Sequence, residues 1–466
     1  MEHKELREKL FYTQKNGYDR IGEEERRGIF KTAENYMTFL AHAKTERDAA
    51  MTTVELAEAQ GFVPYNRGMK LVPGDRIYTV NHGKSVILAV IGRDGLDTGA
   101  HILAAHIDSP RLDLKPMPMC EEKKELVYFK THYYGGIKKY QWTAIPLELR
   151  GVVALTGGGV VNVEIGAKPG DPVFTITDLL PHLGKDQIAK TLGEGISGEA
   201  LKVLVGSIPL QEDEGTDRAK FAILSYLYEQ YGIREEDFLS AELCIIPHFP
   251  VSDVGFDRSL IGGYGHDDRC CAYASIRALF DIAGTPAKTA VCVLADKEEI
   301  GSVGVTGMQS RFFDTFMEDL CEGFGVPVRA CFEASSCLSA DVCNAFDPIY
   351  AEVSDPGNSA YANYGVSFMK YTGSRGKSGS NDATPELIGT LRTALDAANV
   401  VWQMCELGKV DQGGGGTVAC FMGNRNISTI DIGIPVLSMH APYEVISKLD
   451  LYMAVRAMSA FCAMEE

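Results

Sequence analysis

Residues 101–110 read HILAAHIDSP, and residues 289–304 read TAVCVLADKEEIGSVG. Each stretch is an apolar run of strand length that ends in ionisable side chains, which predicts a buried strand followed by a polar loop. In an open α/β sheet, ligands bind beyond the carboxyl ends of the strands. His106 and the Glu298-Glu299 pair therefore lie where a functional site is expected.

These side chains have the chemistry of a two-metal hydrolase site. Imidazole and carboxylate groups bind divalent cations, and two adjacent glutamates at a strand end diverge, so that one can bind metal while the other acts as a base. Asp108 would share a strand face with His106 and could orient its imidazole. Taken singly, a histidine is more often a packed or surface residue, and a glutamate pair more often a solvated one. The sheltered position at strand ends favours the metal site.

The rest of the chain predicts an α/β fold with an insertion. Residues 5–60 have a helical pattern, and short strands follow. After residue 110 the pattern changes to short β-like pieces with glycine-rich turns, and strands and helices alternate again near the C-terminus. A helix capped by Thr384 and a last helix starting at Pro442 are expected there. The predicted domains are 1–110 and 246–466, two parts of one mixed-sheet domain flanked by helices, and an inserted β-rich domain at 111–245.

Composition excludes several classes of partner. The chain has 63 acidic and 45 basic residues and a net charge of −18, which argues against nucleic acid and anionic membranes as partners. No apolar run approaches the roughly 18 residues of a membrane span. The first residues, MEHKELREKL, are charged, and the twelve cysteines are scattered, which favours reduced thiols. We therefore expect a cytoplasmic protein without a cysteine-based structural zinc cluster.

Five short motifs along the chain resemble those of the aspartyl aminopeptidase family of metallopeptidases. They occur in the family's order between about residues 101 and 443, and the intervening insertion resembles that family's dimerisation domain. The resemblance implies a dinuclear-metal peptidase fold. The motifs are His-x-Asp at 106–108, Gly-x-Asp-Asp at 265–268, Asp-x-Glu-Glu-x-Gly-Ser at 296–302, Ser-Ala-Asp at 339–341 and Met-His at 439–440.

The resemblance implies a role for each motif residue. Glu298 would be the general base, and Asp108 the carboxylate that supports His106. Two divalent ions would be bound, zinc by preference, with cobalt or manganese as alternatives, and a hydroxide bridging them would attack the peptide carbonyl. The implied metal ligands are His106, Asp267 (bridging both ions), Glu299, Asp341 and His440. Read from the sequence alone, Asp267 and Asp268 could instead cap the helix that follows them.

The same resemblance implies contacts with the substrate and between subunits. Lys370 matches a family lysine near the substrate carbonyl, although a solvated strand lysine is an equal alternative. His182 matches a histidine that reaches a neighbouring subunit's active site, in a homo-oligomer that is a closed shell, possibly a dodecamer. Where the aspartyl enzymes have a histidine, this chain has Asn344, which puts a preference for acidic N-terminal residues in doubt.

The leading hypothesis is a metalloaminopeptidase acting on peptides. A related dinuclear deacylase or carboxypeptidase, and a metal-binding scaffold without catalysis, remain alternatives. The two Gly-Lys-Ser strings, at 83–85 and 376–378, lack the glycine five residues earlier that a phosphate-binding loop requires. No H-E-x-x-H helix and no G-x-S-x-G elbow occurs. The preferred N-terminal residue, the native metal and the number of subunits are left open by the sequence.

Overall fold

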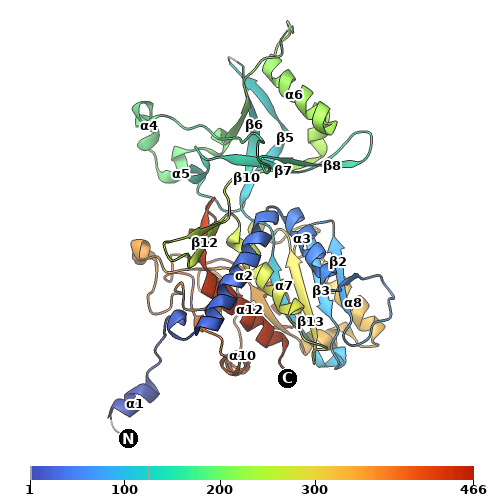
Figure 1. Ribbon diagram of the computed structural model, residues 1–466, viewed down its shortest axis with the longest axis vertical. Coiled ribbons are helices and arrows are strands. Elements are labelled where there is room, and N and C mark those ends of the chain that lie inside the picture. Colours follow the sequence, from blue (N-terminus) through green and yellow to red (C-terminus); the bar gives the residue numbers. More distant parts are fainter. Residues whose placement is uncertain (1–2, 124, 212, 466) are drawn as a thin grey trace.

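The computed structural model describes residues 3–123, 125–211 and 213–465. It has two lobes, a larger one that contains both termini and a smaller one above it in Figure 1. The larger lobe is built on a nine-stranded mixed sheet. In spatial order its strands are β1 (Val63–Pro64), β2 (Arg76–Asn81), β3 (Ser85–Val90), β13 (Thr289–Ala295), β4 (Ala100–His106), β14 (Ser336–Ala340), β18 (Ser428–Gly433), β16 (Val366–Met369) and β17 (Trp402–Met404).

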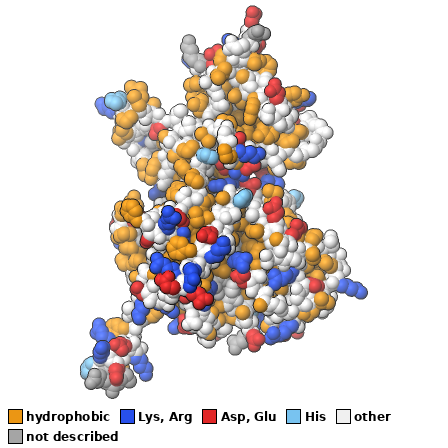
Figure 2. Space-filling view, viewed as in Figure 1, with side chains coloured by type: hydrophobic (Ala, Val, Ile, Leu, Met, Phe, Trp, Pro, Cys, Tyr) orange, Lys and Arg blue, Asp and Glu red, His pale blue; other side chains and the backbone are white. Residues whose placement is uncertain are grey.

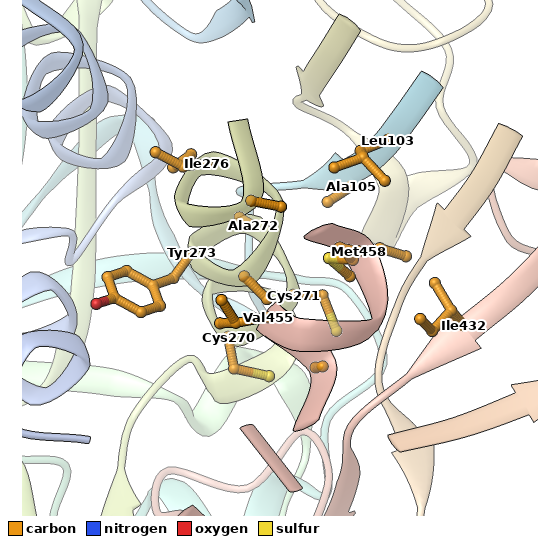
Figure 3. Close-up of a cluster of buried hydrophobic side chains, with 14 of the residues drawn as sticks. Leu103, Ala105, Cys270, Cys271, Ala272, Tyr273, Ile276, Ile432, Val455 and Met458 are labelled. Atoms are coloured by element: carbon orange, nitrogen blue, oxygen red, sulfur yellow. The ribbon is translucent and has the colours of Figure 1, made fainter. Parts of the chain in front are cut away.

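Both faces of this sheet are buried, as expected for strands that read as continuous apolar runs. Along β4, Leu103 and Ala105 face one apolar cluster, while Ile102 and Ala104 face the other. Figure 3 shows the first cluster, where side chains of β4, α7 and α12 meet. Its helices are α2 (Glu23–His42), α3 (Glu46–Ala59), α7 (His266–Phe280), α10 (Pro385–Ala397) and α12 (Lys448–Cys462), and α8 (Phe312–Gly323), α9 (Val328–Glu333) and α11 (Ala419–Gly423) cover the other face.

The central strands β13, β4 and β14 run parallel and pair in register, with Ala295 opposite His106. Their carboxyl ends therefore meet at one edge of the sheet. A small five-stranded sheet lies in the same lobe. Its strands, in order, are β11 (Ser252–Val254), β12 (Leu260–Gly263), β20 (Glu444–Ser447), β19 (Pro435–Leu437) and β15 (Cys343–Asn344).

The smaller lobe is an antiparallel six-stranded sheet with its own apolar core. The helix α6 (Arg218–Tyr231) packs on it, and α4 (Lys185–Ile188) and α5 (Leu192–Gly195) form an arm at one side (Figure 1). Five of the six strands lie within the region predicted as the insertion, 111–245, and β10 extends two residues beyond it. They are β8 (Val160–Ile165), β7 (Leu147–Ala154), β10 (Ala241–Pro247), β5 (Arg111–Glu122), β6 (Leu126–Tyr134) and β9 (Lys202–Gly206). The exact domain limits 1–110, 111–245 and 246–466, and a dimerisation role, stay predictions.

The remaining elements are short. Helix α1 (His3–Leu10) buries no residue and projects from the larger lobe (Figure 1). Among the described residues, no helix combines the length and the apolar character needed to cross a membrane. The 3-10 turns are η1 (Gly17–Asp19), η2 (Leu96–Thr98), η3 (Lys139–Trp142), η4 (Pro181–Leu183), η5 (Gly198–Ala200), η6 (Glu235–Ser240), η7 (Glu298–Ile300) and η8 (Pro348–Val353).

The mixed α/β fold with flanking helices and several mixed sheets confirms the predicted fold class. The Thr384 cap is also confirmed, because its hydroxyl accepts the Leu387 backbone N–H. The predicted start of the last helix at Pro442 is wrong. Residues 444–447 form β20, and α12 begins at Lys448, where the Ser447 side chain accepts two backbone N–H groups. Sheet pairing with β12 and β19 outweighs the local preference for a helix after proline.

Ion pairs, one of them buried, join the two lobes. Arg111, the first residue of β5, is 4% exposed, and its guanidinium lies 2.9 Å from Glu46 of α3. Arg47 and Lys84 of the larger lobe bind Glu242 of β10 at 2.8 and 2.6 Å. Removing one partner of a buried pair leaves an uncompensated charge, which is strongly destabilising.

We therefore expect Arg111→Ala to lower the free energy of unfolding by about 3 kcal/mol, because the buried Glu46 would lose its closest cation and keep only the Lys84 ammonium, 3.8 Å away. The control is Arg93→Ala, whose ion pair with Glu465 is exposed and should cost about 1 kcal/mol or less. Urea unfolding followed by tryptophan fluorescence measures both. Equal effects of the two substitutions would contradict a structural role for the buried pair.

Candidate metal centre

His106 is the last residue of β4 and is 1% exposed. Its Nδ1 lies 3.0 Å from the backbone carbonyl oxygen of Asp108. A carbonyl can only accept, so Nδ1 carries a proton, which leaves Nε2 as the ring atom that can bind a metal ion. That Nε2 lies 3.2 Å from Oδ1 of Asp267 and 3.6 Å from Oδ1 of Asp341.

His440 has a matching arrangement on the other side of Asp267. It lies in the loop after β19, and its Nδ1–H donates to the carbonyl oxygen of Gly136 at 2.7 Å. Its Nε2 lies 3.2 Å from Oδ2 of Asp267 and 3.6 Å from Oε1 of Glu299. Asp267 therefore presents one carboxylate oxygen to each imidazole, which is the arrangement of a bridging ligand.

These distances fit divalent cations. Ligand bonds of 2.0–2.1 Å in tetrahedral geometry place neighbouring ligand atoms about 3.3 Å apart. The buried atoms Asp267 Oδ1 and Glu299 Oε1 accept no hydrogen bond in the described part of the chain. An imidazole nitrogen and a carboxylate oxygen that face each other at this distance need a proton or a metal cation between them. Of the three sets of ligand atoms that come within 4.8 Å of one another among the described residues, two lie here, namely His106, Glu298 and Asp341, and His106, Asp267 and Glu299; the third is Asp268, Cys270 and Cys271.

Asp108 anchors the turn that carries both glutamates. It is completely buried, and its carboxylate accepts the backbone N–H groups of Glu298 and Glu299 at 3.1 and 3.2 Å. Its Oδ1 is also 3.4 Å from Nδ1 of His106. Burial raises the pKa of Asp108, but the hydrogen bond and charge of His106 outweigh it and hold that pKa below its ordinary value. The aspartate thus stays charged and holds η7 against the end of β4.

The site concentrates negative charge away from water. Burial, together with the charges of Asp341 and Asp108, raises the pKa of Glu298 to about 8, in spite of the opposing effect of His106. Burial alone would lower the pKa of His440, but its hydrogen bond to Asp267 and the charge of Glu299 raise it to about 10. Neighbouring carboxylates contribute to both shifts, and bound cations would neutralise that negative charge.

Known proteins share this architecture along the whole chain. The family model described as Aminopeptidase I zinc metalloprotease (M18) matches residues 39–462. The chain belongs to the M18 aminopeptidase family. It is 46% identical to a probable M18 family aminopeptidase 1 of Borrelia garinii subsp. bavariensis over 96% of this chain and 98% of that one. The recognition of this family from five motifs is confirmed, and the chain is an aminopeptidase of a zinc metalloprotease family.

Solved structures of M18 aminopeptidases superpose closely on this one. The enzyme from Thermotoga maritima is 42% identical, with a TM-score of 0.92, covering 97% of this chain and 99% of that chain. Aminopeptidase I from Clostridium acetobutylicum, also 42% identical, has a TM-score of 0.91 with the same coverage. The similarity therefore extends through both lobes.

The candidate metal centre of this M18 chain also contacts residues that the motifs did not indicate. Glu444, 1% exposed at the start of β20, accepts the backbone N–H of His440 at 2.7 Å and that of Asp267 at 3.1 Å. Tyr134, from β6 of the smaller lobe, donates its hydroxyl to Asp108 at 2.7 Å. The sequence offered one signal for Glu444, an acidic residue four positions after the Met-His motif. No pattern in the sequence indicated Tyr134.

The metal centre opens into a cavity of about 410 Å³. Among the described residues that line it there is no lysine or arginine, and the walls away from the carboxylates are largely apolar. The lining residues other than the metal-centre side chains are Gly301, Ser302, Val342, Cys343, Met369, Thr372, Leu407, Gly414, Gly415, Gly416, Thr417, Cys420, Phe421 and Met439.

The two predicted substrate contacts lie elsewhere. Lys370 follows β16, is exposed and does not line the cavity, although Met369 and Thr372 on either side do. His182 lies in η4, in the arm of the smaller lobe, and is exposed. Within one chain, the structure thus brings together His106, Asp267, Glu298, Glu299, Asp341 and His440 with Asp108 behind them, but neither Lys370 nor His182.

The hydroxyl of Tyr134 should influence metal binding through Asp108. We expect Tyr134→Phe to weaken metal affinity about tenfold, because outer partners of metal ligands typically contribute 10–100-fold. Tyr133→Phe is the matched control, since that neighbouring ring is 44% exposed. Competition with a chromophoric chelator measures both affinities, and unchanged binding in Tyr134→Phe would show that the hydrogen bond is dispensable.

Metal affinity should rise with pH. Nε2 of His440 must be unprotonated to bind a cation, and without metal its pKa is about 10. Below that pH, metal binding displaces the proton, so affinity should increase up to about tenfold per pH unit for each proton released. Chelator competition at pH 6, 7 and 8 tests this. An affinity independent of pH would mean that His440 is already neutral in the metal-free protein.

Proposed function

We propose that this M18 aminopeptidase removes N-terminal residues from peptides at a dinuclear metal centre formed by His106, Asp267, Glu299, Asp341 and His440. The observation that supports it most is the carboxylate of Asp267, with one oxygen 3.2 Å from each imidazole Nε2. The imidazole and carboxylate ligands suit zinc best, with cobalt or manganese as alternatives.

When bound, two such ions would acidify a water molecule and polarise the scissile carbonyl. We assign the proton transfers to Glu298. It accepts a proton from the attacking water and delivers it to the leaving amine. Its raised pKa, caused first by burial, suits a group that must both take and release a proton near neutral pH. Asp108 positions Glu298 by accepting its backbone N–H.

The cavity supports a preference for uncharged N-terminal residues. Its walls carry four carboxylates around the metals and no lysine or arginine among the described lining residues. An acidic substrate side chain would find no cation there within one chain, whereas Met369, Leu407 and Met439 offer an apolar surface. This supports the doubt that Asn344 raised about acidic substrates.

We also propose a homo-oligomer in which the arm of the smaller lobe contacts another subunit. Leu179, Leu180, Leu183 and Ile188 are 50–73% exposed on this arm, and Figure 2 shows apolar side chains gathered there. Exposed apolar groups of this density favour association. His182 lies among them, so it could act at a neighbouring site. A contact of Lys370 with substrate, the number of subunits and the cytoplasmic location stay predictions.

The test is hydrolysis of free and N-acetylated amino-acid amides with Zn²⁺, Co²⁺ or Mn²⁺ added. We expect turnover of free amines only, and a loss of kcat of about 10²–10⁴-fold in Glu298→Gln with metal content retained. Glu386→Gln, at an exposed position on α10, should remain fully active. Turnover restricted to acetylated substrates would instead support the deacylase alternative.

A further inference from the structure

A second cavity, of about 240 Å³, adjoins the cavity of the metal centre. The two share Thr372 and Leu407 in their walls. The second is lined by residues 371–377, 406–411 and Gly413, and we name it the Arg375 pocket. A ligand held at the metal centre can therefore extend past Thr372 and Leu407 into it.

The two loops that form the Arg375 pocket are held together by their backbones. Gly373 donates its N–H to the carbonyl of Gly415 at 2.6 Å. Gly414 has a φ of 146°, and a Cβ there would collide with the Gly373 carbonyl and with Ser374. Only glycine permits this approach. The glycine run near residue 414 thus lies directly against the loop at Gly373 and Ser374.

The pocket contains the lysines and arginines that the first cavity lacks, namely Arg375, Lys377 and Lys409. Lys377 and Lys409 already have partners within the chain. The Lys377 ammonium lies 3.1 Å from Asp382 and 3.6 Å from the centre of the Tyr371 ring. The Lys409 ammonium donates to the carbonyl of Glu352 at 2.7 Å.

Arg375 is the basic group that remains available. Its guanidinium makes no ion pair or hydrogen bond within the part of the chain described. Of the two carboxylates in the pocket, Glu406 accepts the hydroxyl of Tyr371, and Asp411 is exposed. In a chain of net charge −18, an unpaired guanidinium beside the active site is suited to attract a carboxylate.

We propose that the Arg375 pocket binds a carboxylate on the part of the peptide that follows the cleaved bond. This rests on the proposed aminopeptidase function, in which the metal centre fixes the N-terminal residue. An extended chain advances about 3.3 Å per residue, so the next one to three residues reach beyond the first cavity. The four carboxylates of the metal centre repel a substrate carboxylate, whereas Arg375 provides the opposite charge. Short peptides with a free C-terminus are the preferred substrate class.

The first experiment compares tripeptides that have a free C-terminal carboxylate with their C-terminal amides. Arg375→Gln should raise KM about three- to tenfold for the free acids and leave the amides unchanged. Arg258→Gln is the matched control, because Arg258 is also exposed and also has a positive φ, 56° against 47° for Arg375. Added salt should reduce the advantage of the free acids in the wild type.

A second comparison distinguishes the two sources of the carboxylate. Amidated tripeptides with glutamate or glutamine at the second or third position test an acidic side chain in place of the C-terminus. Arg375→Glu should reverse the preference and favour lysine there. If only the free C-terminus responds to Arg375, the pocket binds the peptide terminus; if only glutamate responds, it binds an acidic side chain.

Other outcomes would overturn the proposal. If Arg375→Gln impairs free acids and amides equally, the residue has only a structural role. If it impairs only substrates with an acidic N-terminal residue, the pocket holds the first side chain instead. Hydrolysis of amino-acid amides, which carry no downstream carboxylate, tests the aminopeptidase function separately, so the two proposals can fail independently.

Discussion

The carboxylate of Asp267 between two imidazoles is the interaction on which the site depends. Each of its oxygens lies 3.2 Å from an Nε2 whose ring is fixed by a backbone carbonyl on the other side. Neither imidazole can turn away without losing that bond. The polypeptide thus holds two ligand nitrogens against one buried carboxylate, an arrangement in which a bound metal cation would replace the imidazole protons.

This arrangement explains why the smaller lobe matters to the chemistry. The segment from Tyr134 to Gly136 leaves β6 and reaches the metal centre, where Tyr134 binds Asp108 and the Gly136 carbonyl fixes His440. Ion pairs at Arg111 and Glu242 hold the same lobe against α3 and β3. A shift of the lobe would therefore disturb the partners of both imidazoles.

The chemistry of the site also separates into two regions. The metal centre concentrates carboxylates and is bordered by apolar walls, while the adjoining pocket contains the lysines and arginines. The amine of a substrate would lie near the carboxylates, its uncharged first side chain against the apolar walls, and its downstream carboxylate near the lysines and arginines. Such a division favours short peptides without requiring a basic group near the metals.

The strands β4 and β13 and the polar groups at their ends could be predicted from the sequence, because a buried strand must be apolar along its length and can change to ionisable residues only where it leaves the core. Parallel pairing then brings His106 beside the Glu298 turn and Asp341. The full set of candidate ligands was implied by the resemblance of the five motifs to the family, because Asp267, Asp341 and His440 taken singly have other common roles.

Only the tertiary structure decided which distant groups meet. Tyr134 of β6 contacts Asp108, which follows β4 of the other sheet. Glu444 reaches Asp267 because β20 pairs with β12. The same strand pairing moved the start of the last helix from Pro442 to Lys448. The Arg375 pocket likewise needs two loops to touch through Gly373 and Gly415. Sequence alone determined the residues that can do the chemistry, because apolar periodicity and donor type are local properties. Their partners were decided by packing between segments far apart in the chain, where no local pattern carries information.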